Sequence, residues 1–153
     1  MSEPVLELRS ISKNFGETQA LDDINLTVEH GSLIVLLGPA GAGKTTTLRI
    51  IAGLEAPSSG QVFIEGTDFT KHQPNQRDIA MIFDNLALYP NKTGFENIAS
   101  PLRIAKTPKD EVNRRVHELA GMLKIDHILE RTPATFSGGE RQRVALGRAM
   151  IRQ

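Results

Sequence analysis

The feature that most constrains this chain is a glycine-rich loop that fits the pattern G-x-x-x-x-G-K-[ST] at every fixed position. It consists of Gly38, Pro39, Ala40, Gly41, Ala42, Gly43, Lys44 and Thr45. Glycines let the backbone curl so that its N–H groups point at phosphate oxygens, and a following helix N-terminus adds positive charge. Lys44 supplies a cation for the β- and γ-phosphates, and Thr45 offers a hydroxyl to Mg²⁺. Because chance produces such a match in roughly one of a couple of hundred chains of this size, the loop predicts a nucleoside-triphosphate binder.

The first half of the chain predicts an α/β arrangement around this loop. Apolar and polar residues alternate within residues 1–31, and a period of two is typical of strands with one buried face. Residues 32–83 contain two continuous apolar runs, which are typical of strands buried on both faces in a parallel sheet. The elements expected in this zone are a strand over 33–37, a helix over 44–52, a strand around Val62 and Ile64, and a strand over 79–83.

The second half, residues 84–153, predicts helices. Thr93 and Glu96 have the spacing of a capping box, and Thr107 followed by Pro108 indicates a second helix start. Apolar residues then recur at helical spacing at Val112, Val116, Leu119, Ala120 and Leu123. A last helix is expected from near Ser137, with its apolar side formed by Val144, Leu146 and Ala149. No stop signal follows it before Gln153, so we expect the sequence to be a fragment.

Composition excludes several classes of protein. Eighteen basic residues balance eighteen acidic ones, so the chain lacks the excess positive charge of a domain that binds nucleic acid through a bulk field. The 39% hydrophobic content can build a core, and the absence of cysteine excludes disulfides and thiolate metal sites. No apolar run approaches the roughly 18–20 residues of a membrane span, and we expect no cleaved secretion signal.

Asp84 follows the apolar run 79–83 and has two possible roles. An aspartate after such a strand holds Mg²⁺ in many phosphate-loop proteins, which would make Asp84 a metal ligand. Aspartate also favours turns, so Asp84 could equally cap the turn that follows the run. The residues alone leave both roles open.

A second candidate anion site opens the last helix. Ser137 and Glu140 have the spacing of a capping box, but capping does not explain the adjacent Gly138 and Gly139, which lower helix propensity by about 1 kcal/mol each. Glycines at a helix N-terminus allow a bulky anion to approach the backbone. We therefore expect Ser137 both to cap the helix and to donate to a phosphate oxygen.

Phe15, the glycine-rich loop and residues 137–149 together closely resemble the ATP-binding-cassette (ABC) transporter ATPases, over essentially all of the chain. Residues 77–83 and 88–90 resemble the ATPase subunits of carbohydrate and polyol importers. The resemblance implies a partial nucleotide-binding domain of the P-loop α/β fold. It comprises an antiparallel β subdomain (1–31 with about 60–70), a phosphate-loop core (32–83) and a helical subdomain (84–153).

The resemblance also implies a role for each candidate residue. Phe15 would stack on adenine, with plain strand packing as the alternative, and Gly38 through Thr46 would cradle the phosphates of ATP. Asp84 falls on the Q-loop, where the family's glutamine contacts Mg²⁺ and the attacking water. Ser137, Gly138 and Gly139 would bind the γ-phosphate held by a second ATPase subunit.

The implied partners are that second ATPase subunit, transmembrane permease subunits that dock around residues 84–101, and, indirectly, a solute-binding protein. The implied location is peripheral, on the cytoplasmic face of the membrane. Asp84, Glu140 and Phe136 depart from the family's residues at their positions. The family's later Asp-Glu strand and switch histidine are missing, so we expect the isolated chain to be aggregation-prone and a weak nucleotide binder. Asp84 also leaves open the alternative that the chain is a non-catalytic nucleotide-binding subunit, which pairs with a competent ATPase. A DNA-maintenance ATPase is disfavoured because the chain has no sustained heptads.

Overall fold

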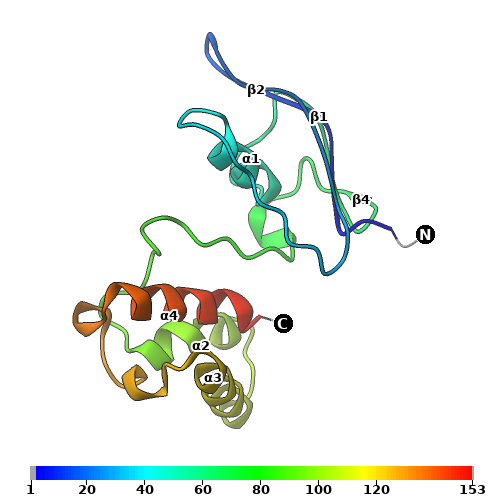
Figure 1. The fold of residues 1–153 in the computed structure, drawn as a ribbon. Helices are drawn as coiled ribbons and strands as arrows, with labels where there is room; N and C mark the ends of the chain where they lie inside the picture. The colour runs from blue at the N-terminus through cyan, green and yellow to red at the C-terminus, as the bar shows by residue number, and fades with distance from the viewer. Residues whose placement is uncertain (1–2, 153) are drawn as a thin grey trace. The chain divides into compact units, whose positions relative to one another are not determined.

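The computed structural model describes residues 3–152 (Figure 1). The chain divides into two compact units, Met1–Ile79 and Ala80–Gln153, and each is described by itself. No helix between residues 3 and 152 is long and apolar enough to cross a membrane.

The first unit is built on an antiparallel sheet with the strand order β2-β1-β3-β4. Its strands are β1 (Leu6–Phe15), β2 (Thr18–Val28), β3 (Ser59–Ile64) and β4 (Thr67–Asp68). The expected alternation is confirmed, because one face supplies Leu8, Ile11 and Val62 to a buried cluster. The helix α1 (Lys44–Ile51) adds Ile50 to that cluster, and a short 3-10 turn, η1 (Pro74–Gln76), follows the sheet.

The two apolar runs expected to form buried parallel strands do not form strands, and this expectation was wrong. Residues 33–37 and 79–83 have no strand assignment, and the described strands all belong to the one antiparallel sheet. Leu33 and Leu37 are 89% and 88% exposed. A strand exists only where a neighbouring backbone accepts and donates its hydrogen bonds, and no described strand lies in register with either run. An apolar composition alone therefore does not make a strand of either segment.

The second unit is helical, as expected. Its helices are α2 (Gly94–Ile104), α3 (Lys109–Leu123) and α4 (Gly138–Met150), with 3-10 turns η2 (Asp126–Ile128) and η3 (Pro133–Thr135). The capping box of Thr93 and Glu96 is present at the start of α2. The second start is found one residue later than Thr107, with Pro108 at the N-cap and no side-chain cap. The spaced apolar residues of α3 pack into the core of the unit, as the periodicity predicted.

The apolar side of α4 differs from the expectation. Val144 is fully buried, but Leu146 is 38% exposed, and the other buried positions are Ala145 and Gly147. A Cβ on Gly147 would lie 3.2–3.3 Å from side-chain carbons of Leu123 and Ile98. Small residues thus let α4 approach α2 and α3 closely. Leu146 lies about 200° around the helix from the buried Val144 and therefore faces solvent.

Candidate functional site

The glycine-rich loop is positioned by β2 and α1. Gly43 is the N-cap of α1 with φ of +80°, a backbone conformation that favours glycine. A Cβ at this position would overlap the Leu21 side chain and lie 2.6 Å from the carbonyl oxygen of Ala20. Glycine is therefore required at position 43 for two reasons: the positive φ and the close approach of β2.

Lys44 curls back into the loop from the first position of α1. Its Nζ donates hydrogen bonds to the carbonyl oxygens of Gly38 (2.7 Å) and Pro39 (2.6 Å). The first turn of α1 contains no acidic residue, so the positive end of the helix dipole and the Lys44 ammonium lie together without a nearby helical carboxylate. This combination fits an anionic group such as a polyphosphate.

The threonines after Lys44 have different environments. Thr45 is exposed, Thr46 is half-buried, and Thr47 is buried with its hydroxyl donating to the Gly43 carbonyl at 3.0 Å. The exposed Thr45 hydroxyl is thus the one available as a metal ligand. No cluster of three or more His, Asp or Glu residues suited to a metal occurs within residues 3–152. Because Mg²⁺ takes much of its coordination from phosphates and water, one hydroxyl at a nucleotide site fits this ion.

Phe15 ends β1, paired with Thr18 of β2. Its ring is 48% exposed and does not join the buried cluster of the first unit. Lys13 places its Nζ 4.8 Å from the ring centroid and also pairs with Glu55 at 2.6 Å. The half-exposed ring is accessible for stacking, and it lies outside the buried cluster that strand packing would join.

Asp84 lies in the second unit, exposed at the first position of a turn over residues 84–87. In this turn the N–H of Leu86 donates to the Phe83 carbonyl at 2.8 Å. Asp84 thus lies in a turn, and among the described residues of this unit no group of three or more possible metal ligands surrounds it.

The start of α4 is held by the expected capping box. Ser137 is the N-cap, its hydroxyl accepts from the Glu140 N–H, and the Glu140 carboxylate accepts from the Ser137 N–H at 2.7 Å. The Ser137 N–H, then its hydroxyl, then the His127 ring lower the pKa of Glu140 to about 2. The His127 Nε2 lies 3.0 Å from Glu140 Oε1.

Gly138 and Gly139 are exposed, and packing within the unit does not require them. A Cβ on Gly138 would meet nothing within 4 Å, and one on Gly139 would approach only the end of the Arg143 side chain, at 3.9 Å. The open space over this helix start leaves room for an external group to reach the backbone N–H groups. This supports the anion-binding interpretation over capping alone.

Sequence reasoning missed two buried polar residues that shape these regions. Arg77 is 2% exposed, and its guanidinium donates to the carbonyls of Ile50 and Ile51 at the end of α1 and to Phe69. Burial lowers the pKa of Arg77. Its only sequence signal is an arginine beside an apolar run, which also occurs on surfaces.

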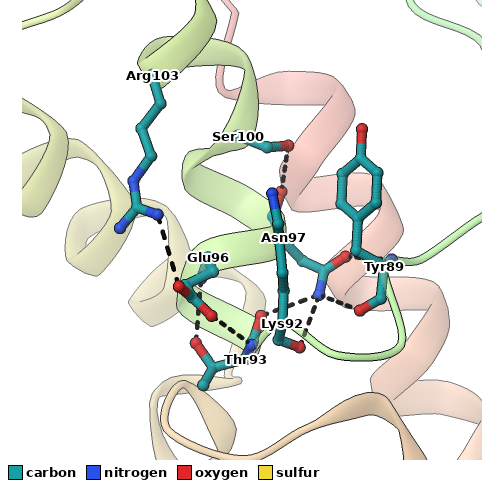
Figure 2. Close-up of polar contacts among 7 residues, drawn as sticks. All are labelled: Tyr89, Lys92, Thr93, Glu96, Asn97, Ser100 and Arg103. Atoms are coloured by element: carbon teal, nitrogen blue, oxygen red, sulfur yellow. Dashed lines mark hydrogen bonds and ion pairs between the residues drawn. The ribbon is translucent and has the colours of Figure 1, made fainter.

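Asn97 of α2 is the second missed residue (Figure 2). It is fully buried, and its carboxamide bonds only to the backbone of the preceding loop. Its oxygen accepts from the Tyr89 N–H, and its Nδ2 donates to the carbonyls of Tyr89, Lys92 and Thr93 at 2.9–3.1 Å. Asn97 directly follows the charged Glu96, so the neighbouring sequence gives no signal that could have identified it.

Comparisons with known proteins agree with this geometry. Residues 21–153 match the family model of the ABC transporter. The chain is 49% identical over 96% of its length to the sn-glycerol-3-phosphate import ATP-binding protein UgpC 1 of Rhizobium etli, and covers 42% of that protein. It is 47% identical over 97% of its length to the trehalose/maltose import ATP-binding protein MalK of Thermococcus litoralis, and covers 41% of it. Relatives named for spermidine/putrescine and sulfate/thiosulfate import match at 42% and 45%.

Among solved structures, the ATP-binding cassette MJ0796, a dimer in a post-hydrolysis state with ADP and Pi, matches with a TM-score of 0.84 and 29% identity. The match covers 95% of this chain and 69% of that one. The chain therefore belongs to the ABC transporter family, whose ATPases bind ATP. It spans about two-fifths of the length of the curated relatives it matches. Phe15 and residues 38–46 lie in the first unit, whereas Asp84 and residues 137–139 lie in the second.

Proposed function

We propose that this chain is the ATP-binding part of an ABC importer ATPase, which hydrolyses ATP to ADP and phosphate to drive solute uptake. The observation that carries the proposal is the glycine-rich loop, in which Gly43 is the N-cap of α1 and Lys44 turns its ammonium back onto the carbonyls of Gly38 and Pro39. A helix N-terminus, a curled backbone and a cation at one point are the elements of a polyphosphate site. The proposed domain division remains 1–31 with 60–70, 32–83 and 84–153.

The proposed roles follow from these positions. Phe15 stacks on the adenine ring, and Gly38 through Thr46 surround the phosphates, with Lys44 beside the β- and γ-phosphates. The Thr45 hydroxyl and Asp84 are the proposed ligands of Mg²⁺, which when bound neutralises charge that develops on the phosphates. Asp84 accepts hydrogen bonds but, when ionised, lacks the amide donor of glutamine, so it holds the attacking water through acceptor contacts alone.

The helix start at residues 137–139 is proposed to complete the site of a second ATPase subunit. Ser137 donates to the γ-phosphate there, and the unobstructed backbone of Gly138 and Gly139 lets the phosphate approach. The dimeric neighbour with ADP and Pi is consistent with such pairing. The remaining proposed partners are permease subunits, which contact residues 84–101 on the cytoplasmic face of the membrane, and through them a solute-binding protein.

For the solute we propose a carbohydrate or polyol. The names of the relatives support an importer in general but include polyamine and sulfate systems as well as glycerol phosphate and maltose. The support for the narrower class is the resemblance of residues 77–83 and 88–90 to carbohydrate and polyol importer ATPases.

Titration of the chain with a fluorescent ATP analogue and Mg²⁺ tests the proposal. We expect Lys44→Ala to weaken binding by about tenfold to a hundredfold, because a charge-assisted contact to the phosphates is lost. Lys71→Ala is the matched control, since Lys71 is an exposed lysine of the same unit. Equal affinity of the Lys44→Ala variant and the wild-type chain would refute the proposed phosphate site.

A further inference from the structure

The segment after Asp84 contains a bend that its residue types do not favour. Leu86 and Ala87 are consecutive and both have positive φ, of 57° and 43°. Within the bend the Leu86 N–H donates to the Phe83 carbonyl at 2.8 Å, and the Ala87 N–H donates to the Asn85 carbonyl at 2.7 Å. Residues with a side chain other than Asn or Asp rarely occupy this region, so the bend persists only if contacts elsewhere hold it.

Arg148 of α4 supplies such contacts. Its Nη1 donates to the Ala87 carbonyl at 2.7 Å, and its Nη2 donates to the Leu86 carbonyl at 2.8 Å. The planar guanidinium thus spans both residues of the bend at once, which a lysine ammonium cannot do in the same geometry. The Tyr89 ring lies 5.4 Å from the Arg148 Cζ and covers the guanidinium from another direction.

The chain beyond the bend is fixed independently. Asn97 of α2 holds the backbone of Tyr89, Lys92 and Thr93 from inside the unit (Figure 2). The portion that Arg148 controls is therefore short and ends at Leu88. It begins at Asp84, which is exposed in the same turn.

We propose that Arg148 is a positioning residue that holds the 86–87 bend and thereby ties the Asp84 segment to α4. Helix α4 then carries the Ser137–Gly139 segment at its N-terminus and Arg148 near its C-terminus. We call the two contacts of Arg148 with the bend the clamp. Resting on the proposed function, this linkage passes a shift of α4, when its N-terminus engages a nucleotide phosphate, to Asp84. When the clamp is released, the bend relaxes toward the backbone angles that leucine and alanine prefer.

Amide hydrogen exchange of the intact chain tests the clamp without any ligand. We expect Arg148→Lys to speed exchange at the Leu86 and Ala87 amides by about tenfold, because one ammonium cannot replace a two-pronged, charge-assisted contact. Exchange at core amides such as Ile98 should stay unchanged. Arg114→Lys is the matched control, since Arg114 makes only exposed ion pairs on α3.

A rescue variant separates positioning from mere stabilisation. Ala87 is exposed, and glycine adopts positive φ without the steric penalty of a Cβ. Adding Ala87→Gly to Arg148→Lys should therefore restore slow exchange at Leu86, whereas it cannot repair a packing defect in α4. Unchanged exchange in Arg148→Lys, an equal rise at Ile98, or no rescue would each overturn the proposal. If the wild-type chain shows no ATP binding, the proposed function is overturned, whereas the exchange result on the clamp is unaffected.

Discussion

Replacing Asn97 with alanine tests how the second unit holds its exposed loop. In the native fold the carboxamide makes four hydrogen bonds to the backbone of Tyr89, Lys92 and Thr93 (Figure 2). Asn97 itself is fully buried. In the alanine variant, three backbone carbonyls therefore lose a hydrogen-bond donor and one backbone N–H loses its acceptor. Because the site is buried, water replaces these partners poorly.

The size of the effect follows from these contacts. A hydrogen bond within a protein contributes about 1 kcal/mol net, and a buried group left unpaired costs more than one that water can reach. With part of the loop rehydrated, we expect Asn97→Ala to lower the free energy of unfolding by about 3 kcal/mol. For a urea dependence of about 1.5 kcal/mol/M, the unfolding midpoint falls by about 2 M.

The chain carries its own probe for this measurement. Tyr89 is the only tyrosine and there is no tryptophan, so tyrosine fluorescence during urea unfolding follows this loop. Asn113→Ala is the control, because Asn113 is exposed on α3 and its replacement should change stability by less than about 0.5 kcal/mol. An Asn97→Ala midpoint equal to that of the control would refute the reasoning.

Asn97→Asp adds a pH-dependent version of the same test. The new carboxylate can still accept from the Tyr89 N–H, but its other oxygen would face carbonyls and has no hydrogen to donate. The folded state therefore raises the pKa of this carboxyl above its unfolded value of about 3.9. We expect the destabilisation to be full near pH 7 and to diminish as pH falls through the raised pKa, relative to Asn97→Ala at each pH.

Three further outcomes follow from the geometry. Gly43→Ala should lower the free energy of unfolding of the first unit by about 3 kcal/mol, whereas Gly41→Ala should lower it by about 1 kcal/mol, because a Cβ at position 41 meets no atom within 4 Å. Thermal unfolding followed by circular dichroism compares the two variants. Arg77→Met should cost about 3 kcal/mol because carbonyls at the end of α1 lose their donor, and amide exchange in β1 measures it. The folded state lowers the pKa of Glu140 to about 2, so its stabilisation is present above pH 4.5 and is lost toward pH 2; Glu140→Gln should abolish that pH dependence in urea unfolding.

Features with local causes could be predicted from the sequence. The capping boxes at Thr93 and Ser137 were identified because each cap contacts a residue only three positions away. The strands of residues 1–31 and the core face of α3 followed from periodicity, which the backbone geometry converts directly into one buried face. The glycine-rich loop was identified because its motif is contiguous in the sequence, from Gly38 to Thr45.

Features that depend on distant partners could not be predicted. The runs 33–37 and 79–83 have the apolar composition that is typical of strands. A strand also needs a neighbouring strand to hydrogen-bond with, and a short stretch of sequence does not show whether folding supplies one. Leu146 was expected on the apolar side of α4, yet the buried side is formed by Val144, Ala145 and Gly147, and the last two are too small to mark that side in the apolar pattern.

The sequence by itself thus determined the helix starts to within about a residue, the residues that form the glycine-rich loop, and the family to which the chain belongs. Only the tertiary structure decided what holds those parts in place. Arg77 reaches carbonyls 26 and 27 residues away, and Arg148 reaches carbonyls 61 and 62 residues away. The physical reason is that a buried or half-buried polar side chain takes the backbone partners that folding brings to it, and these partners leave no pattern in the neighbouring sequence.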